Sequence, residues 1–124
     1  MIIPVVTKDI IYFSKLQSIS NKDRYSLQQV KSKEDILIVL FKCDYPLCLL
    51  DFSCDLIESF KLKDLLKNRG CHTISSIAYY PHIQKDIKQR AIDYGTTIQV
   101  TRNELYKNLN NILDDALFNE ITSS

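Results

Sequence analysis

The sequence contains little glycine and no long apolar run. Only two glycines occur, Gly70 and Gly95, and each ends a segment of helical periodicity, where glycine commonly terminates a helix. Phosphate-binding loops and dinucleotide-binding turns each need several closely spaced glycines, so the sequence excludes both. No apolar run approaches the ~20 residues of a membrane-spanning helix, and the first residues lack the pattern of a secretory signal. We therefore expect a cytoplasmic protein with no membrane partner.

Charge of one sign is not concentrated anywhere in the chain. The sequence has 16 Lys and Arg and 15 Asp and Glu, which gives a formal net charge of +1. Both signs are spread almost evenly over the two halves. Proteins that bind DNA or RNA usually carry a basic patch that neutralises phosphates. We expect no nucleic-acid partner.

The cysteines do not form a recognisable metal motif. They are Cys43, Cys48, Cys54 and Cys71. No two of them form a C-x-x-C pair, and their spacing matches no common zinc module, so we interpret them as reduced and mostly buried thiols. An alternative metal site would combine Cys54 and Cys71 with His72 and His82, but its ligands come from three separate segments. We expect no metal ion and no cofactor.

Hydrophobic periodicity in the second half alternates between strand and helix. Residues 71–80 form a β-branched and aromatic run that ends before Pro81, and a helical pattern then continues to Gly95. The run "TTIQV" predicts a short strand, and Thr101 and Glu104 have the spacing of a capping box. The following helix would bury one apolar face, formed by Leu105, Leu109, Ile112, Leu113 and Ala116.

The first half repeats this alternation. Strands are predicted at "IIPVV", "YSLQQV" and "LCLL", and helices at residues 9–20, 32–43 and 55–69. Pro4 weakens the first strand because proline cannot donate to a sheet ladder. Five strands alternating with five helices predict an α/β domain at residues 1–120, with a parallel sheet covered by helices on both faces. Residues 121–124 are expected to be a frayed tail.

The buried positions follow from the same periodicity. The predicted core contains Val5, Val6, Phe13, Leu16, Ile38 or Val39, Leu47, Leu49, Phe60, Leu65, Ile77, Ile87, Ala91, Ile98, Val100, Leu109 and Leu113.

Four polar segments would meet at the carboxyl edge of the predicted sheet, where open parallel sheets form their ligand crevice. These segments are "TKD", "DFS", "YYPH" and "TRN". The chain length, the alternation of strands and helices, and an aspartate ending the third strand resemble the receiver domain of bacterial response regulators. The resemblance implies a flavodoxin-like three-layer sandwich with strand order 2-1-3-4-5. It also makes Asp51 the candidate phosphoacceptor.

The sequence departs from an active receiver at the positions that support phosphorylation. Receivers bind Mg²⁺ through an acidic pair after the first strand and stabilise the phosphoryl group with a lysine after the fifth. Here Thr7 and Lys8 replace the acidic pair, leaving Asp9 as the nearby carboxylate, and Thr101 and Arg102 follow the fifth strand. The chain is similar to degenerate pseudo-receivers. This implies a signalling module that binds a protein partner, is not phosphorylated and is not an enzyme.

Each residue at this edge also has a purely structural interpretation. Asp51 is at a position where a carboxylate caps the following helix or turn, and His82, just after Pro81 at a helix start, is at a position typical of a surface or capping residue. A cation such as Arg102 is unfavourable at a helix N-terminus unless it serves another group. That group would be an anion or Asp51 itself, and we favour a structural ion pair between Asp51 and Arg102.

Two further alternatives concern function and surface. The segment "LLDFS" followed by a helix is also similar to the anti-sigma-factor antagonist domain, where a serine in this region is phosphorylated; there Ser53 or Ser59 would matter. Separately, Tyr80 and Tyr106 are candidate interface residues for a protein partner or a second copy of the chain, because tyrosine is enriched at interfaces. The alternative is that these rings simply cover the core.

Overall fold

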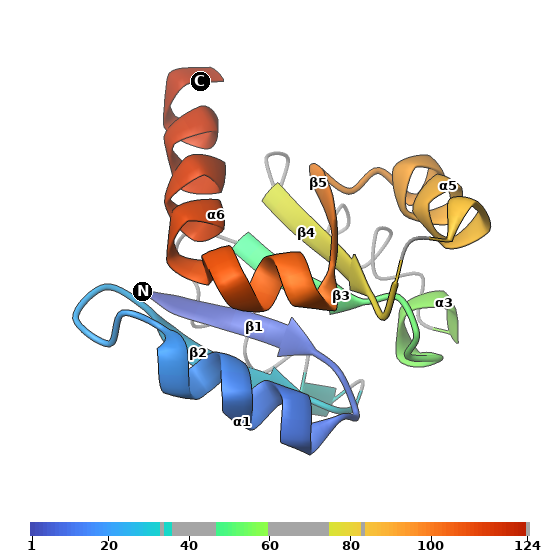
Figure 1. Cartoon of the computed structure of the whole chain (residues 1–124), viewed down its shortest axis with the longest axis horizontal. Coiled ribbons are helices and arrows are strands. Elements are labelled where there is room, and N and C mark those ends of the chain that lie inside the picture. Colours follow the sequence, from blue (N-terminus) through green and yellow to red (C-terminus); the bar gives the residue numbers. More distant parts are fainter. Residues whose placement is uncertain (33, 36–46, 60–74, 83, 124) are drawn as a thin grey trace.

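The computed structural model describes residues 1–32, 34–35, 47–59, 75–82 and 84–123 (Figure 1). Within them, five parallel strands form one sheet in the order β2-β1-β3-β4-β5, which confirms the predicted flavodoxin-like topology. The strands are β1 (Ile2–Val6), β2 (Ser26–Val30), β3 (Leu47–Asp51), β4 (Ser75–Tyr80) and β5 (Ile98–Thr101). The helices are α1 (Ile10–Ile19), α3 (Leu56–Ser59), α5 (Lys85–Tyr94) and α6 (Arg102–Ser123).

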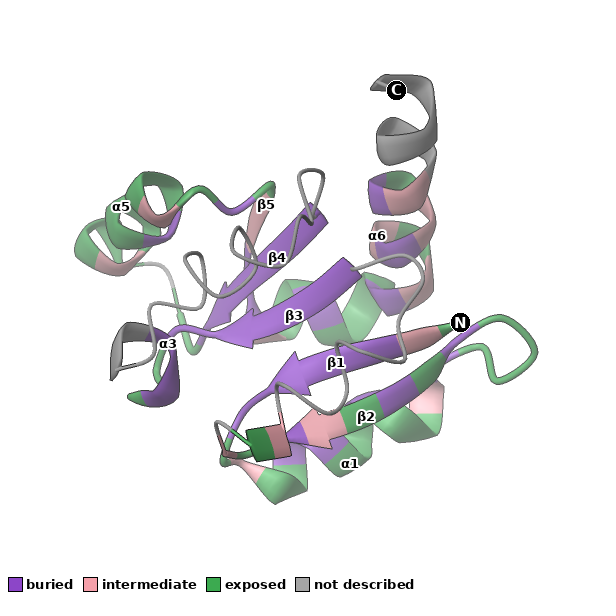
Figure 2. Ribbon diagram, turned by 180° about the vertical axis from the view of Figure 1, so that it is seen from behind, coloured by how far each residue is buried: buried purple, intermediate pink, exposed green. Residues whose placement is uncertain are grey.

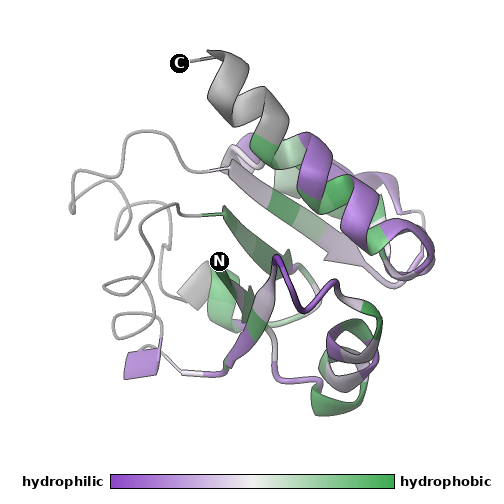
Figure 3. Ribbon diagram, turned by 90° about the vertical axis from the view of Figure 1, so that its left-hand side faces the viewer, coloured by the Kyte–Doolittle hydropathy of each residue, from purple (hydrophilic) through white to green (hydrophobic). Residues whose placement is uncertain are grey.

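Two apolar clusters lie on opposite faces of the sheet. Residues of α1 and α6 contribute to one cluster, whereas residues of α3 and α5 contribute to the other. Figure 2 shows that β1, β3 and β4 are almost wholly buried, whereas the edge strand β2 is partly exposed and the helices keep exposed outer faces. The side view in Figure 3 places α1 and α6 on the same side of the strands. The resulting three layers are those expected when helices cross over on both faces of a parallel sheet.

The predicted core agrees closely with the observed burial. All the predicted core residues within the described ranges are buried except Ile87 and Ile98, which are half-buried and pack against the two clusters. The predictions for Ile38, Val39, Phe60 and Leu65 lie outside the described residues, as do most of the helix predicted at 32–43 and the second part of that at 55–69.

Two predicted helix boundaries are present, whereas Gly70, predicted to end another helix, lies outside the described residues. Gly95 has φ 98° and ψ 23°, a left-handed conformation that suits glycine and ends α5. At the start of α6, the Glu104 N–H donates to Thr101 Oγ1 and the Glu104 carboxylate accepts from the Thr101 N–H, which completes the capping box. Helix α6 is kinked at Asn108, and residues 121–123, expected to be a frayed tail, continue it.

Within the described part of the chain, no helix combines the length and the apolar character that crossing a membrane requires.

Candidate functional site

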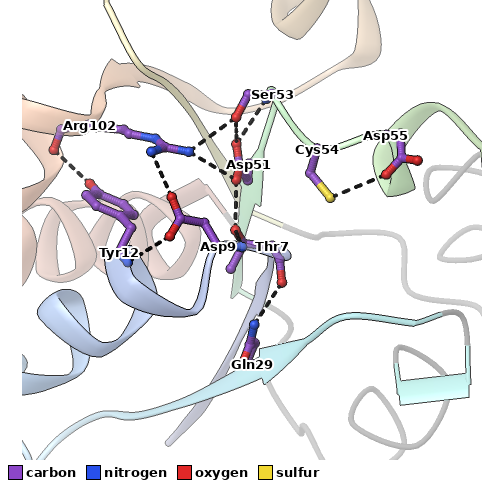
Figure 4. A network of polar contacts seen from close by, with 9 residues as sticks. All are labelled: Thr7, Asp9, Tyr12, Gln29, Asp51, Ser53, Cys54, Asp55 and Arg102. Atoms are coloured by element: carbon purple, nitrogen blue, oxygen red, sulfur yellow. Dashed lines mark hydrogen bonds and ion pairs between the residues drawn. The ribbon is translucent and has the colours of Figure 1, made fainter.

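A polar cluster lies at the carboxyl edge of the sheet, where three strands end (Figure 4). Thr7 follows β1, Asp51 is the last residue of β3, and Arg102 follows β5 as the first residue of α6. Because parallel strands present their carboxyl ends at one edge, segments far apart in the sequence meet here. Asp9 and Ser53, from the loops after β1 and β3, complete the cluster.

Asp51 is buried, with 2% of its surface exposed, and both of its carboxylate oxygens are fully engaged. Oδ1 accepts hydrogen bonds from the Ser53 N–H at 3.0 Å and from the Ser53 hydroxyl. Oδ2 accepts from the Thr7 hydroxyl at 2.7 Å and from Arg102 Nη2 at 3.4 Å. A carboxylate offers about four acceptor positions, so these contacts leave none of them open.

Arg102 bridges two carboxylates. Its Nη1 donates to Asp9 Oδ2 at 3.0 Å, while Nη2 contacts Asp51 and also donates to Ser53 Oγ at 3.3 Å. A cation at a helix N-terminus is opposed by the helix dipole, and the two carboxylates offset that cost. The predicted ion pair between Asp51 and Arg102 is therefore present, and Asp9 is an additional partner that the sequence did not indicate.

Asp9 has a second role as the N-cap of α1. Its Oδ1 accepts from the Tyr12 N–H at 3.0 Å, and its own N–H donates to the Thr7 hydroxyl at 3.0 Å. The pKa of Asp9 is lowered first by this bond from the Tyr12 N–H and then by the Arg102 charge. Asp9 is thus held as a carboxylate at neutral pH and is already committed to two partners.

Lys8 lies at the open side of the cluster. Its ammonium group pairs with Asp55 Oδ1 at 2.9 Å, and this pairing raises the pKa of Lys8 and lowers that of Asp55. Both side chains are exposed, so the pair contributes little to stability. An open pocket of about 270 Å³ is lined by Lys8, Asp9, Asp51, Ser53, Cys54, Asp55 and Arg102.

The remaining predicted site residues lie elsewhere. His82 is exposed, and its Nε2 lies 2.8 Å from the Gln84 side-chain amide rather than in contact with the cluster. Tyr106 is 42% exposed on α6, as an interface residue would be. Tyr80 is only 3% exposed, so the structure corrects its assignment as an interface candidate: the ring packs inside the domain. Sequence patterns did not separate these two tyrosines because both lie beside apolar positions.

Sequence reasoning missed Tyr12, and it placed Thr7 at this edge without predicting its role. The Thr7 hydroxyl joins Asp51 to the Asp9 backbone, and the Tyr12 hydroxyl donates to the Arg102 carbonyl at 2.7 Å. A signal for Tyr12 existed, because it lies three residues after a helix-capping aspartate. Its contact with Arg102 joins residues 90 positions apart and has no local pattern.

No group of three or more His, Cys, Asp or Glu side chains within the described ranges is arranged to bind a metal ion. Of the alternative metal ligands considered from the sequence, Cys71 and His72 lie outside those ranges, and Cys54 is half-buried beside Asp55.

Comparison with known proteins supports the fold and does not identify a family. No family model matches the sequence, and no curated protein matches it either. Among solved structures, the chain is similar to NtrX from Brucella abortus, crystallised in complex with ADP, with a TM-score of 0.78 and 14% identity. The match covers 98% of this chain and only 27% of the NtrX chain.

Two smaller proteins are matched over nearly their whole length. A CheY-like response regulator receiver domain from Methanospirillum hungatei has a TM-score of 0.67 and 15% identity, with 95% of this chain and 97% of that chain covered. A response regulator from Thermotoga maritima has a TM-score of 0.67 and 12% identity, with 93% and 95% covered. The chain therefore has the fold of a receiver domain, and at this identity the likeness extends no further.

Proposed function

We propose that the chain is a regulatory module with the receiver fold, which acts by binding another protein and does not accept a phosphoryl group on Asp51. The position of Arg102 carries this proposal. Its guanidinium contacts both carboxylates of the cluster, Asp9 at 3.0 Å and Asp51 at 3.4 Å. A positive charge fixed between these carboxylates neutralises the two groups that would otherwise be free to bind a metal ion.

Physical chemistry supports the proposal in two ways. An attacking carboxylate needs a free oxygen, yet both oxygens of Asp51 already accept two hydrogen bonds each. Phosphoryl transfer also needs a divalent cation that neutralises the developing charge. Lys8 and Arg102 both line the pocket and already pair with its carboxylates, Lys8 with Asp55 and Arg102 with Asp9 and Asp51, so a divalent cation would have to displace them.

The proposal includes the absence of enzymatic activity. Ser53 is the exposed hydroxyl of the cluster, and it donates to Asp51, a carboxylate that is already engaged by Thr7 and Arg102 and so is poorly placed to act as a general base. The exposed His82 is paired with Gln84. A role through protein contact is therefore the simpler use of this domain.

The alternative is a phosphorelay receiver in which Arg102 moves aside and Asp51 accepts a phosphoryl group. The position of Asp51 at the end of β3 favours this alternative. The anti-sigma-factor-antagonist interpretation has less support, because the similar solved structures include receiver domains.

Incubation with acetyl phosphate and Mg²⁺ followed by intact-protein mass spectrometry distinguishes the two functions. We expect no added phosphoryl group on the parent protein under conditions that fully label an active receiver domain run in parallel. Addition of one phosphoryl group that is lost in Asp51→Asn would contradict the proposal. The Lys8→Gln variant is the control, because it removes the exposed cation of the pocket and leaves the Arg102 contacts in place. It should remain unlabelled, like the parent protein.

A further inference from the structure

Tyr12 contacts Arg102 at both ends of the residue. The Tyr12 hydroxyl donates to the Arg102 backbone carbonyl at 2.7 Å, and the Arg102 guanidinium carbon lies 4.9 Å from the centre of the Tyr12 ring. We infer that Tyr12 is the positioning residue that keeps Arg102 between Asp9 and Asp51. This inference rests on the proposed function, in which Arg102 keeps Asp51 occupied.

These contacts form a closed ring of interactions. Asp9 accepts from the Tyr12 N–H, Tyr12 donates through its hydroxyl to the Arg102 carbonyl, and Arg102 donates back to Asp9. This closed set of contacts joins the first turn of α1 to the first residue of α6. Because every member has two partners, a shift of α6 relative to α1 would strain several contacts at once.

Arg102 needs such support because its contacts with Asp51 and Ser53 are long. Nη2 is 3.4 Å from Asp51 and 3.3 Å from Ser53, near the limit for a hydrogen bond. Its buried Nε has no hydrogen-bond partner among the described residues. Arginine also loses considerable rotamer freedom when it is fixed. A cation over an aromatic face is attracted to the ring, which stabilises the guanidinium at this place.

Tyr12 is itself held rigidly. It is 9% exposed, and its ring lies 5.3 Å from that of Tyr79 in a tilted arrangement. Burial raises the pKa of the Tyr12 hydroxyl, so the group stays protonated and remains a donor at neutral pH. A fixed ring with a fixed donor can define where the flexible Arg102 side chain rests.

NMR of the arginine side chains tests the inference directly. In uniformly ¹⁵N-labelled protein, a guanidinium held by ion pairs rotates slowly and gives separate Nη signals; those of Arg102 are assigned by their loss in Arg102→Gln. We expect Tyr12→Phe, which keeps the ring and removes the hydroxyl, to broaden these signals. We expect Tyr12→Leu, which removes both contacts, to average them to the position of a free arginine.

Tyr25→Phe is the matched control. The Tyr25 hydroxyl also donates across to α6, to Asp114, but at a place remote from Arg102. This variant should leave the Arg102 signals unchanged. Unchanged Arg102 signals in Tyr12→Phe and in folded Tyr12→Leu would overturn the inference and make Tyr12 a packing residue. If Tyr12→Leu does not fold, Tyr12→Phe alone decides: broadening supports the inference and its absence overturns it.

This test is independent of the phosphorylation assay, because it uses no phosphoryl donor and no metal ion. Labelling of Asp51 by acetyl phosphate would contradict the proposed function. The positioning of Arg102 would then still be judged by the Arg102 NMR signals. Conversely, unchanged signals in the Tyr12 variants would refute the positioning role even if Asp51 is never labelled.

Discussion

At the scale of single residues, the cluster shows how an arginine can stabilise a buried aspartate. A carboxylate as deeply buried as Asp51 needs a counter-charge and hydrogen bonds, because desolvation strongly disfavours an isolated charge. Thr7 and Ser53 supply hydroxyl and N–H donors, and Arg102 supplies the charge. The guanidinium fork suits this task because its nitrogens reach Asp9 and Asp51 together.

We predict that Asp51 and Arg102 are energetically coupled. Arg102→Gln leaves Asp51 without its counter-charge and should lower the free energy of unfolding by about 1–3 kcal/mol. The double variant Arg102→Gln/Asp51→Asn should lose less free energy of unfolding than the two single variants lose together. The difference, the coupling energy, should be about 0.5–3 kcal/mol. Urea denaturation of the four proteins measures this cycle. Additive effects would show that the ion pair contributes nothing to stability.

Lys8→Gln provides the comparison for this cycle. Lys8 and Asp55 form a shorter ion pair, at 2.9 Å against 3.4 Å for Arg102 and Asp51, but both side chains are exposed to solvent. Exposed pairs are screened by water and contribute little. We expect this variant to unfold at the same urea concentration as the parent.

Sequence reasoning predicted part of this cluster. It placed Asp51 and Arg102 at one edge and expected them to pair, because Asp51 ends the third strand, Arg102 follows the fifth, and parallel strands end together. It placed Thr7 at the edge without a role, and it did not find that Tyr12 takes part. Which side chains touch there depends on how α1 and α6 pack against each other, and that packing joins residues with no periodic relation in the sequence.

At the scale of elements, local signals determined where helices begin and end. The capping box formed as predicted, because Thr101 and Glu104 have the spacing that satisfies two free N–H groups.

The effect of Pro4 depends on the neighbouring strands and not on the local sequence alone. Pro4 lies in β1, a central strand, which we expected proline to weaken. The register explains its tolerance: among the described residues β1 pairs with β3 at Val5 and Val6 alone, so Pro4 precedes that ladder.

We predict that Gly95 is required to end α5. Its φ of 98° allows the Gly95 N–H to bond to the Ile92 carbonyl and the Thr96 N–H to the Ala91 carbonyl, which are the two bonds of a Schellman motif. Gly95→Ala should cost about 1–2 kcal/mol, because a Cβ is unfavourable in this region. Gly95→Asn should cost less, since asparagine tolerates it better. Urea denaturation tests this order, and equal stability of the alanine variant would contradict it.

At the scale of the whole molecule, the fold was predictable because it depends on repeated patterns. Each strand and helix contributes its own periodicity, and the crossover rule restricts how they connect. A function has no such redundancy. In the proposed function it depends on a few side chains that differ from those of active receivers, such as Lys8 and Arg102, and on a protein partner. The receiver fold therefore narrows the possible functions without selecting one.

Our last prediction concerns where the domain binds. Tyr106 is a large exposed side chain on α6 and lines an open hollow of about 320 Å³ beside the end of α1. A partly exposed tyrosine beside a hollow suits an interface, because it combines a large apolar ring with a polar tip. We expect Tyr106→Ser to weaken self-association in sedimentation velocity, or to abolish capture of a partner, without changing stability.

Ile11→Ser is the control for this experiment, because Ile11 is 70% exposed near the other end of α1. Both substitutions remove an exposed apolar group, so a general loss of non-specific association through exposed apolar side chains would affect the two variants alike. An effect confined to Tyr106→Ser would place the interface on α6. An effect confined to Ile11→Ser would move it to the start of α1, beside the cluster around Arg102, and would contradict the prediction for Tyr106.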